Sequence, residues 1–415
     1  MNRNRFILGF VFLFFCLSFS FAQTSKRVLF VGNSYTEVNN LPQMVSQIAQ
    51  SMGDNLAVTA NTPGGCTFMQ HCTNQSMTLI CQGGWDAVVL QEQSQYPSFP
   101  QAQVEAEVFP YAQRLVDSIY AHNPCAEPMF YMTWGRKNGD AANAVYFPVL
   151  GTYEGMDSML CLRYTYMATA NDASLCPVGR VWRYLRTHHS SIELYQSDGS
   201  HPSLAGTYAA ACAFYVMLFH QDPTHITYDS GLDSNTAQII RDAVRTVVYE
   251  HITDWQRPEP QAAFDIENTD NQTVTIANNS THASELAWNF GDGETLVSSD
   301  SIITHTYADS GQYTITLNAS RHCMCSTATA LITIPQETGI DTWENTKGSL
   351  LLFPNPAQNT VTIYADGEVF IYNITGQLIK TTGVIQECTT LDISDFPCGI
   401  YIIKSQGESA KLIVR

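Results

Sequence analysis

The stretch Val28-Leu-Phe-Val-Gly-Asn-Ser-Tyr-Thr36 decides the fold of the N-terminal part of this 415-residue chain. Its first four residues form an apolar run, which is typical of a strand buried in a parallel sheet. Gly32-Asn33 ends this run abruptly and places Ser34 just beyond it. Because open α/β sheets carry their sites at the carboxyl ends of their strands, Ser34 is a candidate nucleophile, provided that a base comes from elsewhere.

Strand-like and helix-like patterns alternate from this stretch to about Gln256. Apolar runs end in turn or polar residues, and between them apolar residues recur at helical spacing. This alternation predicts a parallel sheet with helices on both faces. The polar clusters follow the runs directly, which is the best indication of an active site in the sequence. Further strands are expected at Leu56–Ala60, Trp85–Leu90, Met129–Thr133 and Ile192–Tyr195.

A second stretch, Asp198-Gly-Ser-His201-Pro202, provides the acid–base groups that such a serine needs. Ser34 would attack an ester carbonyl, and His201 would accept its proton, because imidazole titrates near neutral pH. Asp198, three residues before His201, would orient the ring and stabilise the imidazolium. Taken singly, these residues are also explained as turn or helix-capping residues, but their combination favours acyl transfer.

Acyl transfer also needs hydrogen-bond donors for the oxyanion that forms on the carbonyl oxygen. The Ser34 backbone amide and the backbone of Gly64-Gly65 are candidates. A side-chain amide of Gln91 or Gln93 is another, because glutamine can donate as asparagine does. These residues also have plain structural explanations, since glycines allow positive φ and glutamines satisfy buried backbone groups.

These stretches resemble the sequence blocks of the SGNH/GDSL hydrolases. Gly32-Asn33-Ser34-Tyr35-Thr36 is similar to the nucleophile block, with asparagine where the usual aspartate stands. The Asp198–Pro202 stretch is similar to the closing Asp-x-x-His block. The third block, usually Gly-x-Asn-Asp, is here Gln91-Glu92-Gln93-Ser94, so that Gln93 falls at the asparagine position. A less characterised branch of the superfamily carries this Leu-Gln-Glu-Gln-Ser version.

The resemblance covers nearly all of residues 25–256. It implies a catalytic domain with a three-layer α/β/α flavodoxin-like sheet, working without a cofactor or metal. The residues it implies are Ser34 as nucleophile, His201 as base and acid and Asp198 as orienting carboxylate, with an oxyanion hole of Ser34, Gly65 and Gln93.

Members of this family are esterases, lipases, thioesterases and carbohydrate deacetylases. For an exported protein, this favours a carboxylic ester hydrolase that acts on O-acyl groups, above all O-acetyl groups, of a glycan or a small molecule. The side chains that would line the substrate groove, or else pack in the interior, are those of Tyr35, Gln91, Glu92, Tyr96, Trp134 and Arg136.

Two other functions fit parts of the sequence. The altered third block is compatible with a cell-surface glycan-binding or adhesion protein on a degenerate hydrolase fold, although the intact Ser34, Asp198 and His201 oppose it. A thiol-dependent enzyme using Cys66 or Cys212 is a weaker alternative, because Cys212 lies in an apolar helical pattern typical of a core.

The chain changes character after the stiff segment Arg257-Pro-Glu-Pro260. Over residues 260–336, short alternating runs divided by Asn, Asp and Gly predict a β-sandwich. Trp288-Asn-Phe-Gly-Asp-Gly293 and the segment His305–Leu317 closely resemble the PKD domain. The resemblance implies a spacer or adhesion module in which the tryptophan and tyrosines are core and turn residues.

Residues 348–415 again show short strand patterns. The segments Leu351–Ala357, Val369–Gln377 and Gly399–Lys404 match the type IX secretion C-terminal sorting domain at almost every landmark. The resemblance implies recognition by the type IX secretion machinery and delivery to the cell surface or the medium. An ordinary β-sandwich would explain the strands but not this order of motifs.

The first residues predict a signal peptide over residues 1–22. Arg3 and Arg5 precede the apolar run Phe6–Phe21, and Ser20-Phe21-Ala22 offers a cleavage site. No later apolar run is long enough to cross a bilayer, so we expect an exported protein that is not integral to a membrane. The formal charge of −18 argues against binding nucleic acid.

The chain has twelve cysteines, of which Cys16 lies in the predicted signal peptide. Export permits disulfides, and the odd number that remains leaves at least one thiol without a partner in the chain. Without a CxxC repeat or paired histidines at ligand spacing, no metal site is expected. The plausible local pairs are Cys66 with Cys72 or Cys81, Cys161 with Cys176, and Cys388 with Cys398.

Overall fold

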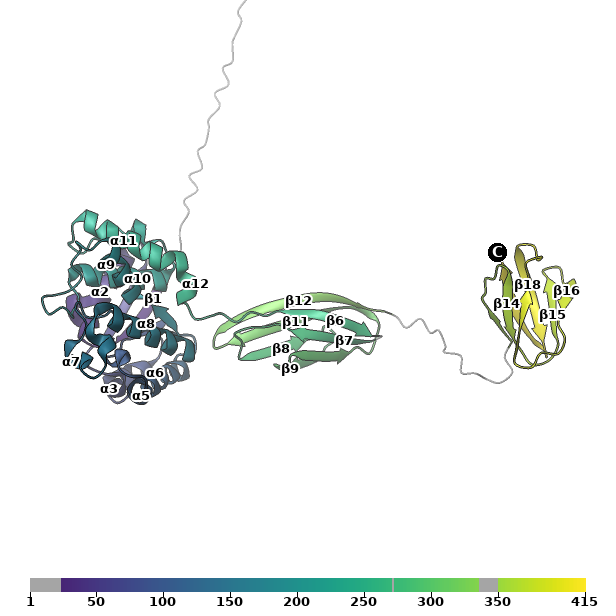
Figure 1. The fold of residues 1–415 in the computed structure, drawn as a ribbon, viewed down its shortest axis with the longest axis horizontal. Helices are drawn as coiled ribbons and strands as arrows, with labels where there is room; N and C mark the ends of the chain where they lie inside the picture. Colours follow the sequence, from purple (N-terminus) through teal and green to yellow (C-terminus); the bar gives the residue numbers. More distant parts are fainter. Residues whose placement is uncertain (1–23, 271, 336–349) are drawn as a thin grey trace, which may run out of the picture. The chain divides into compact units, whose positions relative to one another are not determined.

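The computed structural model describes residues 24–270, 272–335 and 350–415 (Figure 1). The predicted signal peptide with Cys16 lies outside the described residues. By compactness the chain divides into two units, Met1–Pro335 and Gln336–Arg415. Among the described residues, no helix combines the length and apolar character needed to cross a bilayer.

A five-stranded parallel sheet with the order β2-β1-β3-β4-β5 forms the centre of the N-terminal part. β1 pairs with β2 on one side and with β3 on the other, so that Val31 lies beside Leu90 near the carboxyl ends of both strands. Helices cover both faces of β1, which explains why Val28–Val31 are all apolar and buried. The strands are β1 (Ser25–Val31), β2 (Asn55–Asn61), β3 (Ala87–Leu90), β4 (Glu127–Tyr131) and β5 (Ser174–Cys176).

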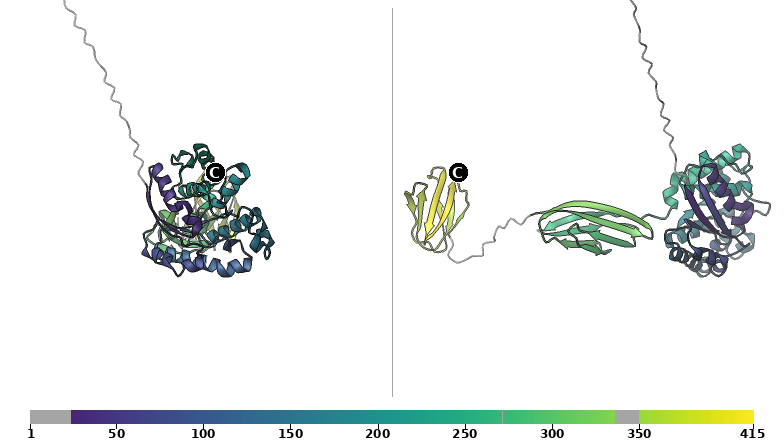
Figure 2. Two further views of the ribbon diagram at one scale, coloured as in Figure 1. Left: turned by 90° about the vertical axis from the view of Figure 1, so that its left-hand side faces the viewer. Right: turned by 180° about the vertical axis from the view of Figure 1, so that it is seen from behind.

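Helices pack on both faces of this sheet, and the strand alternation divides the core between them (Figures 1 and 2). Val28 and Phe30 face the core formed with α2, α9, α10 and α11. Leu29 and Val31 face the second core, formed with α4, α6 and α8. The α-helices are α1 (Ser34–Glu37), α2 (Leu41–Ser51), α3 (Phe68–His71), α4 (Gln75–Gln82), α5 (Gln101–Glu107), α6 (Phe109–His122), α7 (Ala141–Ala144), α8 (Tyr153–Ala170), α9 (Val178–His188), α10 (Leu204–Phe219), α11 (Ser234–Val247) and α12 (Ile252–Trp255).

The expected three-layer α/β/α class is confirmed, but the fifth strand is not the predicted one. The sheet's fifth strand is β5, Ser174–Cys176, whereas the expected segment Ile192–Tyr195 contributes only an isolated bridge between Tyr195 and Pro202. Leu194 and Tyr195 are nevertheless buried against helices, which accounts for their apolar character. β5 was missed because three residues are too short to show a periodicity.

Residues 264–270 and 272–334 form two antiparallel sheets, with orders β10-β7-β6 and β12-β11-β8-β9. The expected core role of the aromatic residues agrees with the structure: Trp288 and Tyr307 are buried, and the Tyr307 hydroxyl donates to the Phe290 carbonyl (2.9 Å). Asp292 accepts from the buried His305 ring (2.7 Å). The strands are β6 (Phe264–Asp270), β7 (Thr273–Asn278), β8 (Glu285–Asn289), β9 (Thr295–Val297), β10 (Ile302–Thr306), β11 (Gly311–Arg321) and β12 (Met324–Ile334).

The second unit is a small antiparallel sandwich of two sheets, with orders β13-β14-β17 and β16-β15-β18-β19. Its core consists of alternating apolar residues such as Val361, Ile371 and Ile403. The strands are β13 (Leu351–Phe353), β14 (Thr360–Tyr364), β15 (Val369–Asn373), β16 (Leu378–Thr381), β17 (Cys388–Asp392), β18 (Gly399–Ser405) and β19 (Glu408–Val414).

The disulfide within the described residues joins Cys125 to Cys323, which are 198 residues apart in the sequence. All of the local pairs expected from the sequence are wrong in this structure, because each of those seven cysteines is a free thiol. Nearness in sequence was the wrong guide, because Cys125 precedes β4 and Cys323 lies in the turn between β11 and β12.

Candidate active site

The nucleophile turn places Ser34 at the first position of α1, directly after the buried end of β1. The Asn33 side chain caps this short helix by accepting from the Tyr35 amide (3.2 Å). Gly32 allows the turn to lie close to its neighbours: a β-carbon there would be 2.5 Å from Thr36 Oγ1 and 2.7 Å from Gln91 Oε1. The turn therefore requires glycine at position 32 for steric reasons.

Ser34, His201 and Asp198 form a continuous hydrogen-bonded chain. The Ser34 Oγ lies 2.9 Å from His201 Nε2, and His201 Nδ1 lies 2.5 Å from Asp198 Oδ2. A proton on Nδ1, donated to the carboxylate, leaves Nε2 free to accept the serine proton. Asp198 Oδ1 also accepts from the backbone amides of Ser200 (2.9 Å) and His201 (3.0 Å), so the carboxylate fixes the loop as well as the ring.

The electrostatics of Asp198 suit this role. Partial burial alone would raise the pKa of its carboxyl, but the hydrogen bonds from the His201 ring and from the Ser200 and His201 amides outweigh that effect. The pKa therefore lies below its ordinary value, and Asp198 is an anion at neutral pH.

A column of buried aromatic rings supports the histidine loop. Tyr35 stacks on Trp134 (4.8 Å between centroids), which stacks on Trp182 (3.7 Å). The Tyr35 hydroxyl lies 2.7 Å from Ser200 Oγ, and the Trp134 indole donates to the Ser200 carbonyl (3.1 Å). Tyr35 and Trp134 are almost completely buried, so we assign them the packing role and not contact with substrate.

Gln91 is buried at the end of β3, and its side chain is committed to the nucleophile turn. Its Oε1 accepts from the Asn33 amide and from Thr36 Oγ1 (2.9 Å each), while its Nε2 donates to Asn33 Oδ1 (3.0 Å) and to the Glu92 carbonyl. Both amide protons are thus in use. Gln91 orients the turn that carries Ser34 and has no proton left for an oxyanion.

The oxyanion donors proposed from the sequence lie on three segments. Ser34 begins a helix, so its amide has no partner within that helix, and Gly65 has a positive φ of 66° on an exposed loop. Among the described residues, neither amide donates a hydrogen bond to an acceptor. Gln93 Oε1 accepts from the Gln95 amide (2.8 Å), and Gln93 Nε2 donates one proton to Gln95 Oε1 (3.3 Å), which leaves the other.

The outer part of the site is linked through Asp140, which the sequence did not single out. Arg136 pairs with Asp140 Oδ1 (3.4 Å), and Asp140 Oδ2 accepts from Gln95 Nε2 (2.5 Å). Arg136 keeps 29% of its side chain exposed, unlike the buried Tyr35 and Trp134. Arg136 is thus connected to the segment that carries Gln93 and remains accessible to a substrate.

Asn39 is a second residue whose role the sequence did not reveal. It has a positive φ of 56°, and its Nδ2 donates to Thr207 Oγ1 (2.8 Å) and to the Pro202 carbonyl (3.3 Å). These bonds join the segment after α1 to the loop that carries His201. The paired asparagines at positions 39 and 40 were a usable signal, since asparagine tolerates the left-handed region.

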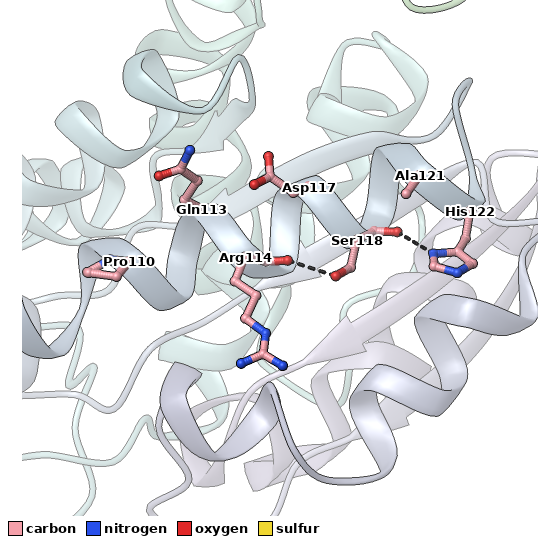
Figure 3. A pocket seen from close by; sticks show the side chains of 7 residues that line it. All are labelled: Pro110, Gln113, Arg114, Asp117, Ser118, Ala121 and His122. Atoms are coloured by element: carbon pink, nitrogen blue, oxygen red, sulfur yellow. Dashed lines mark hydrogen bonds between the residues drawn. The ribbon is translucent and has the colours of Figure 1, made fainter.

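A surface hollow along α6 is separate from this site (Figure 3). Two of its polar side chains bond carbonyls within the helix: Ser118 Oγ donates to the Arg114 carbonyl (2.8 Å), and the His122 ring bonds the Ser118 carbonyl (2.9 Å). None of the residues that line it belongs to the triad of Ser34, His201 and Asp198 or to the segments that carry the oxyanion donors.

Two family models match this chain and confirm the identities expected for its C-terminal parts. Residues 255–335 match the PKD domain, and residues 351–415 match the secretion system C-terminal sorting domain. The chain therefore carries a PKD domain followed by a sorting domain of the type IX secretion system.

Solved structures similar to the N-terminal part are SGNH/GDSL hydrolase-like proteins. A DUF4886 family protein from Bacteroides uniformis is 18% identical, with 55% of this chain and 95% of that one covered and a TM-score of 0.47. A candidate SGNH hydrolase from Slackia heliotrinireducens is 26% identical, with 46% and 98% covered and a TM-score of 0.38.

A curated relative, beta-agarase A from Zobellia galactanivorans, is 36% identical over 69 residues. The match covers 15% of this chain and 13% of that enzyme, so the chain spans only a small share of its length.

Proposed function

We propose that residues 25–256 form a serine ester hydrolase. The observation that carries the proposal is the hydrogen-bonded chain from Ser34 Oγ through the His201 ring to Asp198, at 2.9 and 2.5 Å. Residues far apart in sequence meet there in the order that nucleophilic catalysis needs. The other assignments that go with the proposal are a signal peptide over 1–22, a PKD-like domain over 260–336 and a sorting domain over 348–415.

The reaction proceeds through an acyl-enzyme. His201 Nε2 takes the proton of Ser34 as Oγ attacks the ester carbonyl, and the resulting oxyanion accepts hydrogen bonds from the Ser34 and Gly65 amides and the remaining Gln93 Nε2 proton. Collapse breaks the bond to the alcohol oxygen, which receives the proton from His201. A water then attacks the acyl carbon as His201 takes one of its protons. Collapse breaks the bond between the acyl carbon and Ser34 Oγ, which receives that proton from His201, and the carboxylic acid leaves.

For the substrate we propose O-acyl groups, in particular O-acetyl groups, on a glycan. The sorting domain indicates secretion or display at the cell surface, where polysaccharides are abundant acyl carriers. Arg136, partly exposed and connected through Asp140 and Gln95 to the Gln93 segment, is the side chain to which we assign contact with the acceptor.

Labelling with a fluorophosphonate probe tests the proposal, because the probe phosphonylates only an activated serine. The full-length mature protein should be labelled, and the Ser34→Ala and His201→Ala variants should not. Ser118→Ala is the matched control, since this serine lies on α6, outside the site, and its loss should leave labelling unchanged.

The altered third block keeps one alternative open, a cell-surface glycan-binding protein on a degenerate hydrolase fold. A folded wild-type protein that retains acetylated glycans, but is neither labelled nor able to release acetate, would favour that alternative and contradict the esterase. Labelling that persists in Ser34→Ala would show that another residue reacts, and would equally contradict the assignment.

A further inference from the structure

Glu92 is a buried acidic residue that the proposed reaction does not use. Its side chain has no exposed surface, and Glu92 lies two residues after the end of β3. Glu92 Oε1 accepts from the Gln93 amide (2.5 Å) and the Phe68 amide (3.1 Å), and Glu92 Oε2 also lies 3.0 Å from the Phe68 amide. Among the described residues, Glu92 forms no ion pair with a basic side chain.

The two amides that bind Glu92 belong to the two segments that flank the proposed oxyanion hole. Phe68 follows the Gly64–Thr67 loop, and Gln93 carries the side-chain donor. The Cys66 carbonyl in the same loop accepts from Asn33 Nδ2 (3.1 Å), so this loop is also bonded to the nucleophile turn. The Glu92 amide itself donates to the buried Tyr164 hydroxyl (3.2 Å), which anchors the segment from α8.

From this arrangement we infer that Glu92 is a positioning residue for the oxyanion hole: its carboxyl group holds the Gly65 loop and Gln93 at a fixed separation. The inference rests on the proposed esterase function. It replaces the substrate-contacting role expected from the sequence, because a fully buried side chain bonded to backbone amides has no surface for a substrate.

The geometry predicts that two substitutions of Glu92 disturb the oxyanion hole and that a third leaves it nearly intact. Glu92→Ala removes the acceptor from two buried amides, and Glu92→Asp shortens the side chain so that it cannot bond both. Glu92→Gln keeps an oxygen at the place of Oε1, where one acceptor serves both amides. Because the donors act on the transition state, their displacement should lower kcat and leave KM nearly unchanged.

The experiment measures the rate of fluorophosphonate labelling and the kinetics of 4-nitrophenyl acetate hydrolysis in the full-length mature protein. We expect Glu92→Ala and Glu92→Asp to lower the labelling rate and kcat about 10- to 100-fold, with KM within about twofold. Glu92→Gln should stay within about threefold of the wild type.

Asp54→Ala serves as the control for a purely structural effect. Asp54 is also buried and accepts from the Tyr215 hydroxyl (3.0 Å), but it precedes β2 and so lies at the amino edge of the sheet, away from Ser34. Its loss should lower the melting temperature without lowering kcat of the folded protein.

The possible failures are distinguishable. If folded Glu92→Ala and Glu92→Asp are labelled as fast as the wild type, or behave like Asp54→Ala, the positioning role is overturned and the esterase stands. If Glu92→Ala does not fold, Glu92→Asp decides by the same criterion. A folded wild type that is not labelled overturns the esterase, and the positioning role falls with it.

Discussion

His201 depends on buried neighbours as well as on Asp198. Asp198 keeps 46% of its side chain exposed, so water competes for its carboxylate. Ser200, between the two, is held through its hydroxyl by Tyr35 and through its carbonyl by Trp134. The aromatic column therefore fixes the position of the loop, and in the proposed mechanism the Asp198 carboxylate orients the ring and keeps the proton on Nδ1.

Asp198→Asn tests that division of roles. An asparagine Oδ1 can still accept from the Ser200 and His201 amides, so the turn should survive and the melting temperature should change little. Its NH₂ group would donate to Nδ1 and favour the tautomer protonated on Nε2, which cannot accept the Ser34 proton. We expect kcat for 4-nitrophenyl acetate to fall about 10²- to 10⁴-fold. Wild-type turnover in this variant would exclude Asp198 as the orienting group.

Glu92 also predicts a pH dependence of stability. Burial raises the pKa of its carboxyl to about 8 from an ordinary 4.5, despite hydrogen bonds from the Gln93 and Phe68 amides. Between these pH values, the folded protein holds a proton that the unfolded chain releases, so the free energy of unfolding falls as pH rises. Thermal unfolding between pH 5 and pH 8 should show a steeper loss of stability in the wild type than in Glu92→Gln, on the order of 1 kcal/mol or more.

Neighbouring groups should not obscure this transition. The side chains of Cys66, Cys72 and Tyr164 lie close enough to Glu92 for its charge to affect their pKa values. Burial raises the pKa of each of the three. They remain neutral throughout the window, so the difference between wild type and Glu92→Gln reports on Glu92. Parallel stability curves for the two proteins would show that Glu92 is ionised in the folded state across the whole range.

Secondary structure was predicted best for those helices and strands whose own residues show a distinctive hydrophobic pattern. The apolar run Val28–Val31, ended abruptly by Gly32-Asn33, was correctly predicted as a buried strand, and α10 is apolar nearly all round because it is buried nearly all round. β5 and the isolated bridge at Tyr195 could not be distinguished by pattern, since short apolar segments look alike whether they pair in a sheet or pack under helices.

The residues of the candidate site show the same contrast between local pattern and long-range contacts. Ser34, Asp198 and His201 were visible because a strand end and a tight turn present them, and the structure brings them into one chain of hydrogen bonds. Gln91 and Gln93 could not be ranked as donors, because the partners that occupy Gln91 come from the nucleophile turn, 55 or more residues earlier.

The nucleophile turn itself predicts an effect of Gly32→Ala. The added methyl group would press on Thr36 Oγ1 and Gln91 Oε1, the groups that fix the turn. We expect a loss of stability of about 1–3 kcal/mol and loss of fluorophosphonate labelling, since Ser34 lies two residues away. Gly151→Ala, where a β-carbon would meet its nearest neighbour at an ordinary 3.5 Å, is the control. Full labelling of a stable Gly32→Ala protein would show that the turn can adjust.

A covalent bond between segments far apart in the sequence closes the first unit. Cys125 follows α6, and Cys323 lies in the turn between β11 and β12. Beside the disulfide, Arg321 pairs with Asp172, and the His322 ring stacks on Tyr120 (3.6 Å between centroids). Sequence spacing could not reveal this bond, because its partners are 198 residues apart and only the fold brings them together.

The bond predicts a stability that depends on oxidation. It closes a loop of 198 residues, and a disulfide across such a loop contributes about 2–5 kcal/mol by restricting the unfolded chain. Reduction with dithiothreitol should therefore lower the melting temperature of the first unit, and the double variant Cys125→Ser, Cys323→Ser should melt lower and no longer respond to the reductant. Fluorophosphonate labelling at low temperature should persist in both states, because neither cysteine contacts the triad. A double variant that still loses stability on reduction would place the sensitive disulfide elsewhere in the chain.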